Sequence, residues 1–75
     1  MADISYEIVK HIGKLGEASS RGWQKEVNLI SWNGSRPKID IRDWSENHDK
    51  MGKGVTLTME EALQLSELLQ KEGDG

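Results

Sequence analysis

The chain has 75 residues, with 10 Lys and Arg, 13 Asp and Glu, and no Cys. A domain of this size has a marginal core, and without Cys no disulfide can strengthen it, so a second copy of the chain is the simplest further source of stability. The formal net charge of −3 argues against a protein that coats duplex DNA through bulk positive charge.

The charge is unevenly distributed along the chain. Residues 59–75 carry one Lys against five acids, whereas residues 21–53 carry seven Lys and Arg against five acids and also hold all three Trp. An acidic end can therefore conceal a locally basic surface. No apolar run approaches the roughly 20 residues of a membrane helix, and the first residues lack a signal-peptide pattern. We expect a soluble, cytoplasmic protein.

The first half of the chain predicts two strands and a tight turn. β-Branched and bulky residues predict a strand over residues 6–15, and a Gly- and Ser-rich loop follows over 16–22. Residues 23–32 form the second strand candidate. The Asn-Gly pair at 33–34 is the strongest short hairpin sequence, although the next two residues can lengthen the turn.

The third predicted strand, residues 38–44, alternates between apolar and polar positions. Pro37 precedes it, where a missing N–H does least harm. Ile39 and Ile41 fall on one face, which we expect to be buried. The opposite face should be polar, aromatic and exposed to solvent or a ligand; it carries Lys38, Asp40, Arg42 and Trp44.

The last part of the chain predicts a loop, a short strand and one helix. Residues 45–53 are polar, and residues 54–57 form a fourth strand with Val55 and Leu57 facing inward. Thr58 and Glu61 have the spacing of a capping box, which starts a helix. Its apolar stripe comprises Ala62, Leu65, Leu68 and Leu69, with Leu63 at the edge.

These elements predict an α+β fold. Gly73 should end the helix, and residues 73–75 should be a frayed tail. The expected architecture is ββββα, a single domain over residues 1–75 in which one curved antiparallel four-stranded sheet carries one C-terminal helix.

The three Trp are the residues most indicative of function. An indole is large and apolar, and leaving it exposed without a use is unfavourable. Unpaired bases stack on aromatic rings while nearby cations follow the phosphates, so Trp among Lys and Arg favours a single-stranded ligand. The alternative is that these rings belong to the core or to a dimer interface. The stacking candidates are Trp23, Trp32 and Trp44; the cationic ones are Lys25, Arg36, Lys38, Arg42 and Lys53.

Two segments resemble a known family. Ile39-Asp40-Ile41-Arg42-Asp43-Trp44, followed by a polar loop and Lys53-Gly54-Val55-Thr56-Leu57, resembles the positive cofactor four family of transcriptional coactivators. That family has an I-D-I-R-E-aromatic strand, a loop, a K-G-I-S-L strand and a C-terminal helix, and the match covers roughly residues 22–70. Three segments are closer to its bacterial YdbC-type branch, whose match would cover nearly the whole chain: Gly22-Trp23-Gln24-Lys25-Glu26, Ser31-Trp32-Asn33 and Met51-Gly52-Lys53-Gly54.

The resemblance implies a homodimer whose helices form the subunit interface and whose curved sheets bind single-stranded DNA. It matches Arg42 and Trp44 to the family's arginine and the aromatic after it, and Trp32 to the aromatic that ends the preceding strand. Lys25, Lys38 and Lys53 match basic positions. The hairpin departs from the family pattern because Arg36 is its one basic residue, which implies greater reliance on stacking.

The resemblance thus implies a non-enzymatic protein that binds single-stranded DNA largely without sequence preference, in transcription, replication or repair, and so associates with the nucleoid. RNA remains an alternative ligand. A protein-interaction or dimeric structural module that uses the Trp-rich face remains the alternative function.

Signs of catalysis or of a cofactor are weak. The two histidines, His11 and His48, have no Cys beside them and no nucleophile motif, and His48 is interpreted as a solvated loop residue. Asp43, Glu46 and Asp49 lie near His48, but their spacing matches no metal signature. We therefore expect no cofactor, no metal, no membrane and no small-molecule substrate.

Overall fold

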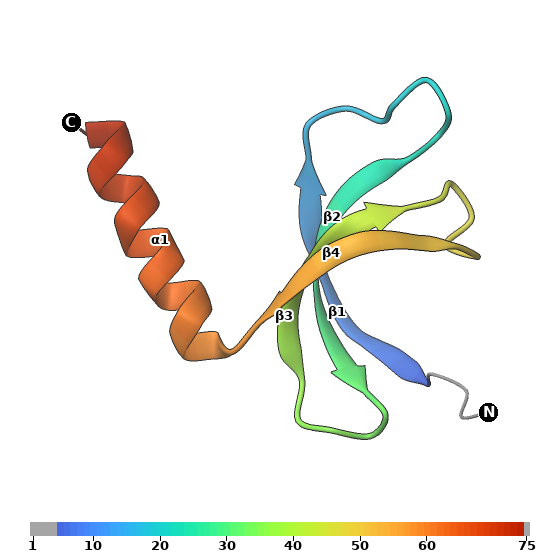
Figure 1. The fold of residues 1–75 in the computed structure, drawn as a ribbon, viewed down its shortest axis with the longest axis horizontal. Helices are drawn as coiled ribbons and strands as arrows, with labels where there is room; N and C mark the ends of the chain where they lie inside the picture. Colours follow the sequence, from blue (N-terminus) through green and yellow to red (C-terminus); the bar gives the residue numbers. More distant parts are fainter. Residues whose placement is uncertain (1–4, 75) are drawn as a thin grey trace.

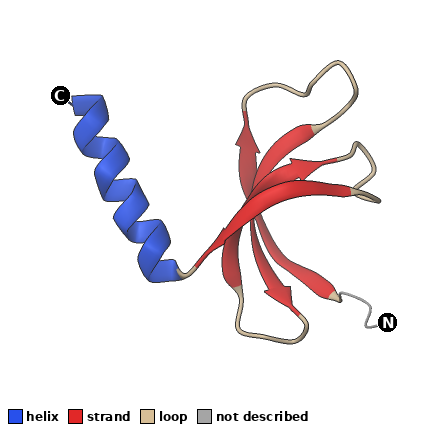
Figure 2. Cartoon of the chain, in the orientation of Figure 1, coloured by secondary structure: helices blue, strands red, loops and turns tan. Residues whose placement is uncertain are grey.

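The computed structural model describes residues 5–74, which form four strands followed by one helix (Figure 1; Figure 2). The expected ββββα fold is confirmed: the strands form one curved antiparallel sheet in the order β1-β2-β3-β4. The bounds are β1 Tyr6–Leu15, β2 Gln24–Trp32, β3 Lys38–Trp44, β4 Met51–Leu57 and α1 Met59–Asp74.

The Asn-Gly turn between β2 and β3 forms as predicted. Asn33 and Gly34 both have positive φ, 50° and 75°, and the N–H of Ser35 donates to the carbonyl of Trp32 at 2.8 Å. Two positive φ values at the centre of a hairpin define the turn type that fits the twist of the strands. Ladder pairing starts at Ile30 and Lys38, so the connection has one more residue on the β3 side than a two-residue hairpin would have, in line with the lengthening that the sequence allowed.

Irregular pairing at both edges of the sheet accompanies its curvature. β1 shifts register against β2 between Ile8 and Lys10 and again between His11 and Gly13. β3 and β4 shift between Arg42 and Trp44, so that Trp44 pairs with Met51. Such bulges bend strands and increase their twist. Because of this pairing β4 begins at Met51, and our expectation of a loop up to residue 53 is wrong.

The helix begins at the predicted capping box. The N–H of Glu61 donates to Oγ1 of Thr58 at 3.1 Å, and the N–H of Thr58 donates to Oε1 of Glu61 at 2.9 Å. The helix continues through Gly73 to Asp74, one residue beyond the predicted end. Gly75, the last residue of the expected frayed tail, and the first residues used to exclude a signal peptide lie outside the described part of the chain.

The position of α1 differs from that of a helix packed flat on a sheet. It leaves β4 and extends away from the strands (Figure 1). Its inner side meets one sheet face over an apolar hollow of about 600 Å³. The lining residues are Ile12, Val27, Ile39, Ile41, Leu57, Ala62, Leu65, Ser66, Leu69 and Gln70.

The fully buried side chains lie on the opposite face from the one that we expected. Trp44 and Ile30 are 0% exposed, whereas Ile39 and Ile41 are only half-buried and Val55 is 48% exposed. The buried face is that of the even-numbered residues of β2 and β3, and we call it the concave face. It also buries three polar residues, Glu26, Asn28 and Asp40. Because no second layer formed by residues 5–74 covers this face, we infer that the curvature of the sheet buries its side chains.

Candidate nucleic-acid interface

A groove at one end of the concave face gathers four of the eight residues chosen from the sequence. Trp32 ends β2, Arg36 lies in the turn, and Lys38 and Arg42 project from β3. The groove has a volume of about 460 Å³. The lining is completed by Asn33, Ser35, Met51 and Thr56. An aromatic ring and three cations around one hollow suit a ligand that carries both π-faces and negative charge.

Arg42 is held in place by a buried carboxylate. Its Nε and Nη2 donate to the two oxygens of Asp40 at 2.6 and 2.8 Å, and Thr56 Oγ1 donates to Asp40 at 2.9 Å. Asp40 is 0% exposed, and a buried charge of this kind is tolerated only when it is paired and hydrogen-bonded. Arg42 therefore has a structural role, and 14% of its side chain remains open to the groove.

Gly54 makes this arrangement possible. A Cβ at that position would overlap Cβ of Arg42 and the carbonyl oxygen of Ile41. The register pairs Gly54 with Arg42, so the arginine side chain crosses β4 where β4 has no side chain. The guanidinium then lies 4.9 Å from the centroid of Trp32, a cation–π contact.

Four rings from distant parts of the chain form a row across the concave face. Tyr6 lies 5.6 Å from Trp32 and 5.7 Å from Trp44, both tilted, and Trp44 stacks on His48 at 4.9 Å. We call Trp32, Tyr6, Trp44 and His48 the aromatic row. Tyr6 is 38% exposed and lies beside the groove because its strand pairs it with Trp32.

Trp44 does not have the exposure that we expected. It lies in phase with Arg42, as the alternation predicted, but it is 0% exposed. The curvature of the sheet closes this position, and Tyr6 and His48 pack against the indole. The prediction of an exposed Trp44 is therefore wrong, and a base has no face of this ring to stack on.

Trp23 and Lys25 lie apart from the groove. They line a separate hollow with Leu15, Glu17, Ser19 and Asp43. Lys25 is an odd-numbered residue of β2, so it lies on the face opposite Trp32. Trp23 is half-buried in the loop before β2, and the indole is near Gly52.

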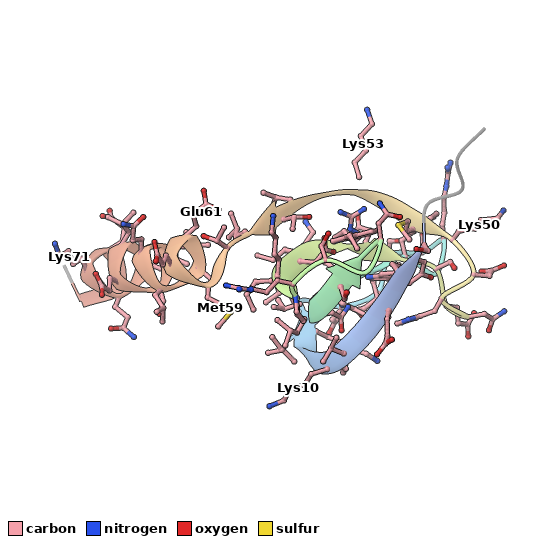
Figure 3. All side chains as sticks on the ribbon, turned by 90° about the horizontal axis from the view of Figure 1, so that it is seen from below. Lys10, Lys50, Lys53, Met59, Glu61 and Lys71 are labelled. Carbon is pink, nitrogen blue, oxygen red and sulfur yellow. The ribbon has the colours of Figure 1, made fainter. Side chains whose placement is uncertain are left out.

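Lys53 is exposed on β4. Figure 3 shows its side chain projecting from the strand on its own, away from the other side chains. A flexible Lys side chain in this position could contact the phosphates of a ligand, but no neighbouring side chain among residues 5–74 holds it in one place.

Three neighbours of the site were not indicated by the sequence: Tyr6, Met51 and Thr56. Their proximity depends on pairing across strands, and the irregular registers of β1 and β4 could not be deduced from local pattern. The one available signal was Tyr6 itself, an aromatic residue at the end of a predicted strand.

A second polar cluster lies at the other end of the concave face. The carboxylate of Glu26, 3% exposed, accepts from Asn28 Nδ2 at 3.3 Å and lies 2.9 Å from Nε2 of His48. His11 Nδ1 lies 2.7 Å from Oδ1 of Asn28 and 3.6 Å from Glu26. No group of three or more acidic or histidine side chains within residues 5–74 is placed to hold a metal ion.

In the same described range, no helix has the length and apolar character needed to cross a membrane.

The similarity to known proteins includes the residues that line the groove. The pattern of the family described as Transcriptional Coactivator p15 (PC4) matches residues 19–68. These residues include β2, β3, β4 and most of α1, and thus every lining residue of the groove. An uncharacterized protein of Treponema pallidum (strain Nichols) is 49% identical over 67 residues, covering 89% of this chain and 78% of that protein.

Proposed function

We propose, since this chain belongs to the Transcriptional Coactivator p15 (PC4) family, that it binds single-stranded DNA on the concave face of its sheet. The family is nucleic-acid-binding and supports a coactivator-like role. Similarity to a bacterial protein agrees with the YdbC-type branch that the sequence indicated. The finer proposal is a non-enzymatic protein that binds without strong sequence preference and serves transcription, replication or repair in the cytoplasm, at the nucleoid.

The groove beside Trp32 is the observation that carries this proposal. A base stacked at Trp32 or Tyr6 would place its phosphates near Arg36 and Lys38, both exposed. Stacking contributes about 1–3 kcal/mol per base and is open to every base, because each base has a π-face. A duplex offers no free base faces, so the groove favours single strands.

The remaining candidate residues lie at the base of the groove or outside it. Arg42 is paired with Asp40 and so adds little net charge; it lies at the base of the groove and contacts the ring of Trp32. Trp23, Lys25 and Lys53 would contact parts of the strand outside the groove. RNA offers the same bases and phosphates, so it is the competing ligand in the test.

A homodimer belongs to the same proposal. Three leucines of α1, Leu63, Leu68 and Leu69, are between 61% and 62% exposed, and the helix stands over an open apolar hollow. Exposed apolar area of this extent marks an interface. A second copy that lays its own helix against this surface would cover it.

The direct test is a titration with labelled oligo-dT of about 20 nucleotides, followed by fluorescence anisotropy at several salt concentrations. We expect binding that unlabelled duplex DNA does not displace. For two or three phosphates neutralised in the groove, log K should fall with log salt with a slope of about −1.4 to −2.1. Oligo-U in the same assay measures the preference for DNA over RNA.

The variant Trp32→Ala should weaken oligo-dT binding by about 1–3 kcal/mol. Gln64→Ala, at an exposed polar position of α1, is a matched control that leaves the groove and the apolar surface of the helix intact. No binding of oligo-dT by the wild-type protein at low salt would refute the proposal, and a stronger interaction with duplex than with single strands would do the same.

A further inference from the structure

The imidazole of His48 lies flat against the buried indole of Trp44. The two ring centroids are 4.9 Å apart and the planes meet at 17°, whereas the other two ring pairs of the aromatic row are tilted by 44° and 49°. This is the stacking geometry that a base adopts on an aromatic platform. His48 thus lies at the end of the aromatic row farthest from Trp32 in the order of contacts.

The orientation of this imidazole is fixed from two sides. Nε2 lies 2.9 Å from Oε2 of Glu26, a carboxylate that is itself buried and bonded to Asn28. The backbone of His48 has φ of 60°, and the N–H donates to the carbonyl of Ser45 at 2.9 Å. The ring is therefore presented in one plane at little further cost in side-chain entropy on binding.

The loop that carries His48 is well bonded. Ser45 Oγ donates to Asp49 at 2.6 Å and accepts from the N–H of Lys50 at 3.0 Å. The hydrogen bond from Ser45 lowers the pKa of Asp49. His48 is thus held on a rigid turn.

The imidazole is partly exposed, and it lines a hollow together with Ala18, Gly22 and Glu46. The side chain of His48 is 39% exposed, while Trp44 beneath it is 0% exposed. Because Trp44 covers the inner face, the exposed area belongs to the outer face and the edge. We propose that this outer face is a second base-stacking site of the concave face. The inference rests on the proposed function.

The roles in this site are divided among three residues. His48 would touch a base, and Trp44 and Glu26 are positioning residues that act through it. Trp44 supports the ring from below, and Glu26 fixes its rotation. Tyr6 lies between Trp32 and Trp44 in the aromatic row. Different bases of one strand would therefore stack at Trp32 and at His48.

The test compares His48→Asn with the wild-type protein in the oligo-dT titration. Asn tolerates a positive φ and keeps a polar group near Glu26, but it has no ring. We expect about a fivefold or greater loss of affinity, the lower limit of stacking for one base. His48→Phe restores a ring but not the contact with Glu26, and Phe is strained at a φ of 60°, so its affinity should lie between those of His48→Asn and the wild type.

Two further measurements separate stacking from a structural role. An abasic oligonucleotide of equal length should bind the wild-type protein and His48→Asn equally, because it offers no base to stack. The carbon-bound ring protons of His48 should shift upfield in NMR spectra when oligo-dT is added. The matched control is His11→Asn, since His11 is bonded to the same Asn28–Glu26 cluster but is not part of the aromatic row.

The outcomes distinguish this inference from the proposed function. If Trp32→Ala loses affinity and His48→Asn does not, the second site is refuted and single-strand binding stands. An equal loss of affinity for abasic and normal strands also refutes it. If the wild-type protein binds no single strand, both proposals fail.

Discussion

Trp44 illustrates how the surroundings of a residue decide its role. In sequence it alternates with Arg42 and Lys38, a pattern typical of an exposed face. In the folded chain Tyr6 and His48 pack against it, and it is the largest fully buried side chain among the described residues. The role of Arg42 also differs from the prediction. We expected its guanidinium to contact phosphates, but in the structure it is paired with the buried carboxylate of Asp40.

We predict that Trp44→Ala acts on stability more than on binding. Removing a buried large aromatic side chain typically costs about 3–5 kcal/mol in the free energy of unfolding. Urea denaturation followed by circular dichroism measures this loss. Trp23→Ala is the matched control; Trp23 is half-buried in a loop, so it should cost less than half as much. An unchanged urea midpoint for Trp44→Ala would contradict the burial described above.

At the scale of elements, β4 forms part of the groove with its backbone as well as with its side chains. Gly54 faces Arg42, and Met51 and Gly52 accept from its Nη1 at 3.6 and 3.3 Å. The strand thus forms one wall of the groove and holds the arginine that contacts Trp32. The polar character of residues 45–53 predicted a loop there, but the start of β4 pairs with β3.

We predict that Gly54→Ala disrupts this wall. The added Cβ would overlap Arg42 and the backbone of β3, so β4 must move, at a cost of about 1–3 kcal/mol of stability. Both the urea midpoint and the affinity for oligo-dT should fall. Gly13→Ala in β1 is a matched control, since a methyl group at that position would have no neighbour within 4 Å and the φ of Gly13 is not positive. Equal behaviour of the two variants would refute the role assigned to Gly54.

For the whole molecule, the two faces of the sheet have different roles. The concave face buries its own side chains and holds the groove, while the other face and α1 leave apolar surface open. Ile30 and Trp44 are the wholly buried apolar residues of the described chain. So small a core is marginal by itself, and the homodimer that we propose would complete it.

We predict that the chain is dimeric in solution and that Leu69→Glu shifts it toward the monomer. A carboxylate at this position would be buried in the interface without a partner, which is strongly unfavourable. Sedimentation equilibrium should give twice the mass of the chain for the wild type and a lower average mass for the variant. Gln64→Glu adds the same charge to the exposed side of α1 and should remain dimeric. A monomeric wild type would remove the dimer from the proposal.

Much of the fold follows from local sequence. The strand of residues 6–15 and that of 38–44 have the predicted bounds, and the Asn33-Gly34 turn and the Thr58 cap form as expected. The turn and the cap depend on interactions within a few residues, and the strands are indicated by residue preferences in the local sequence. Of the site, the groove members Trp32, Arg36, Lys38 and Arg42 were all candidates from the sequence.

The sequence by itself therefore determined the elements, their order and the family to which the chain belongs. Tertiary structure decided which face of the sheet is buried, and with it the roles of Trp44, Tyr6 and His48. The physical reason is that alternation shows only that two faces differ. Which face closes depends on strand register, bulges and twist, and these are set by contacts between residues far apart in the chain.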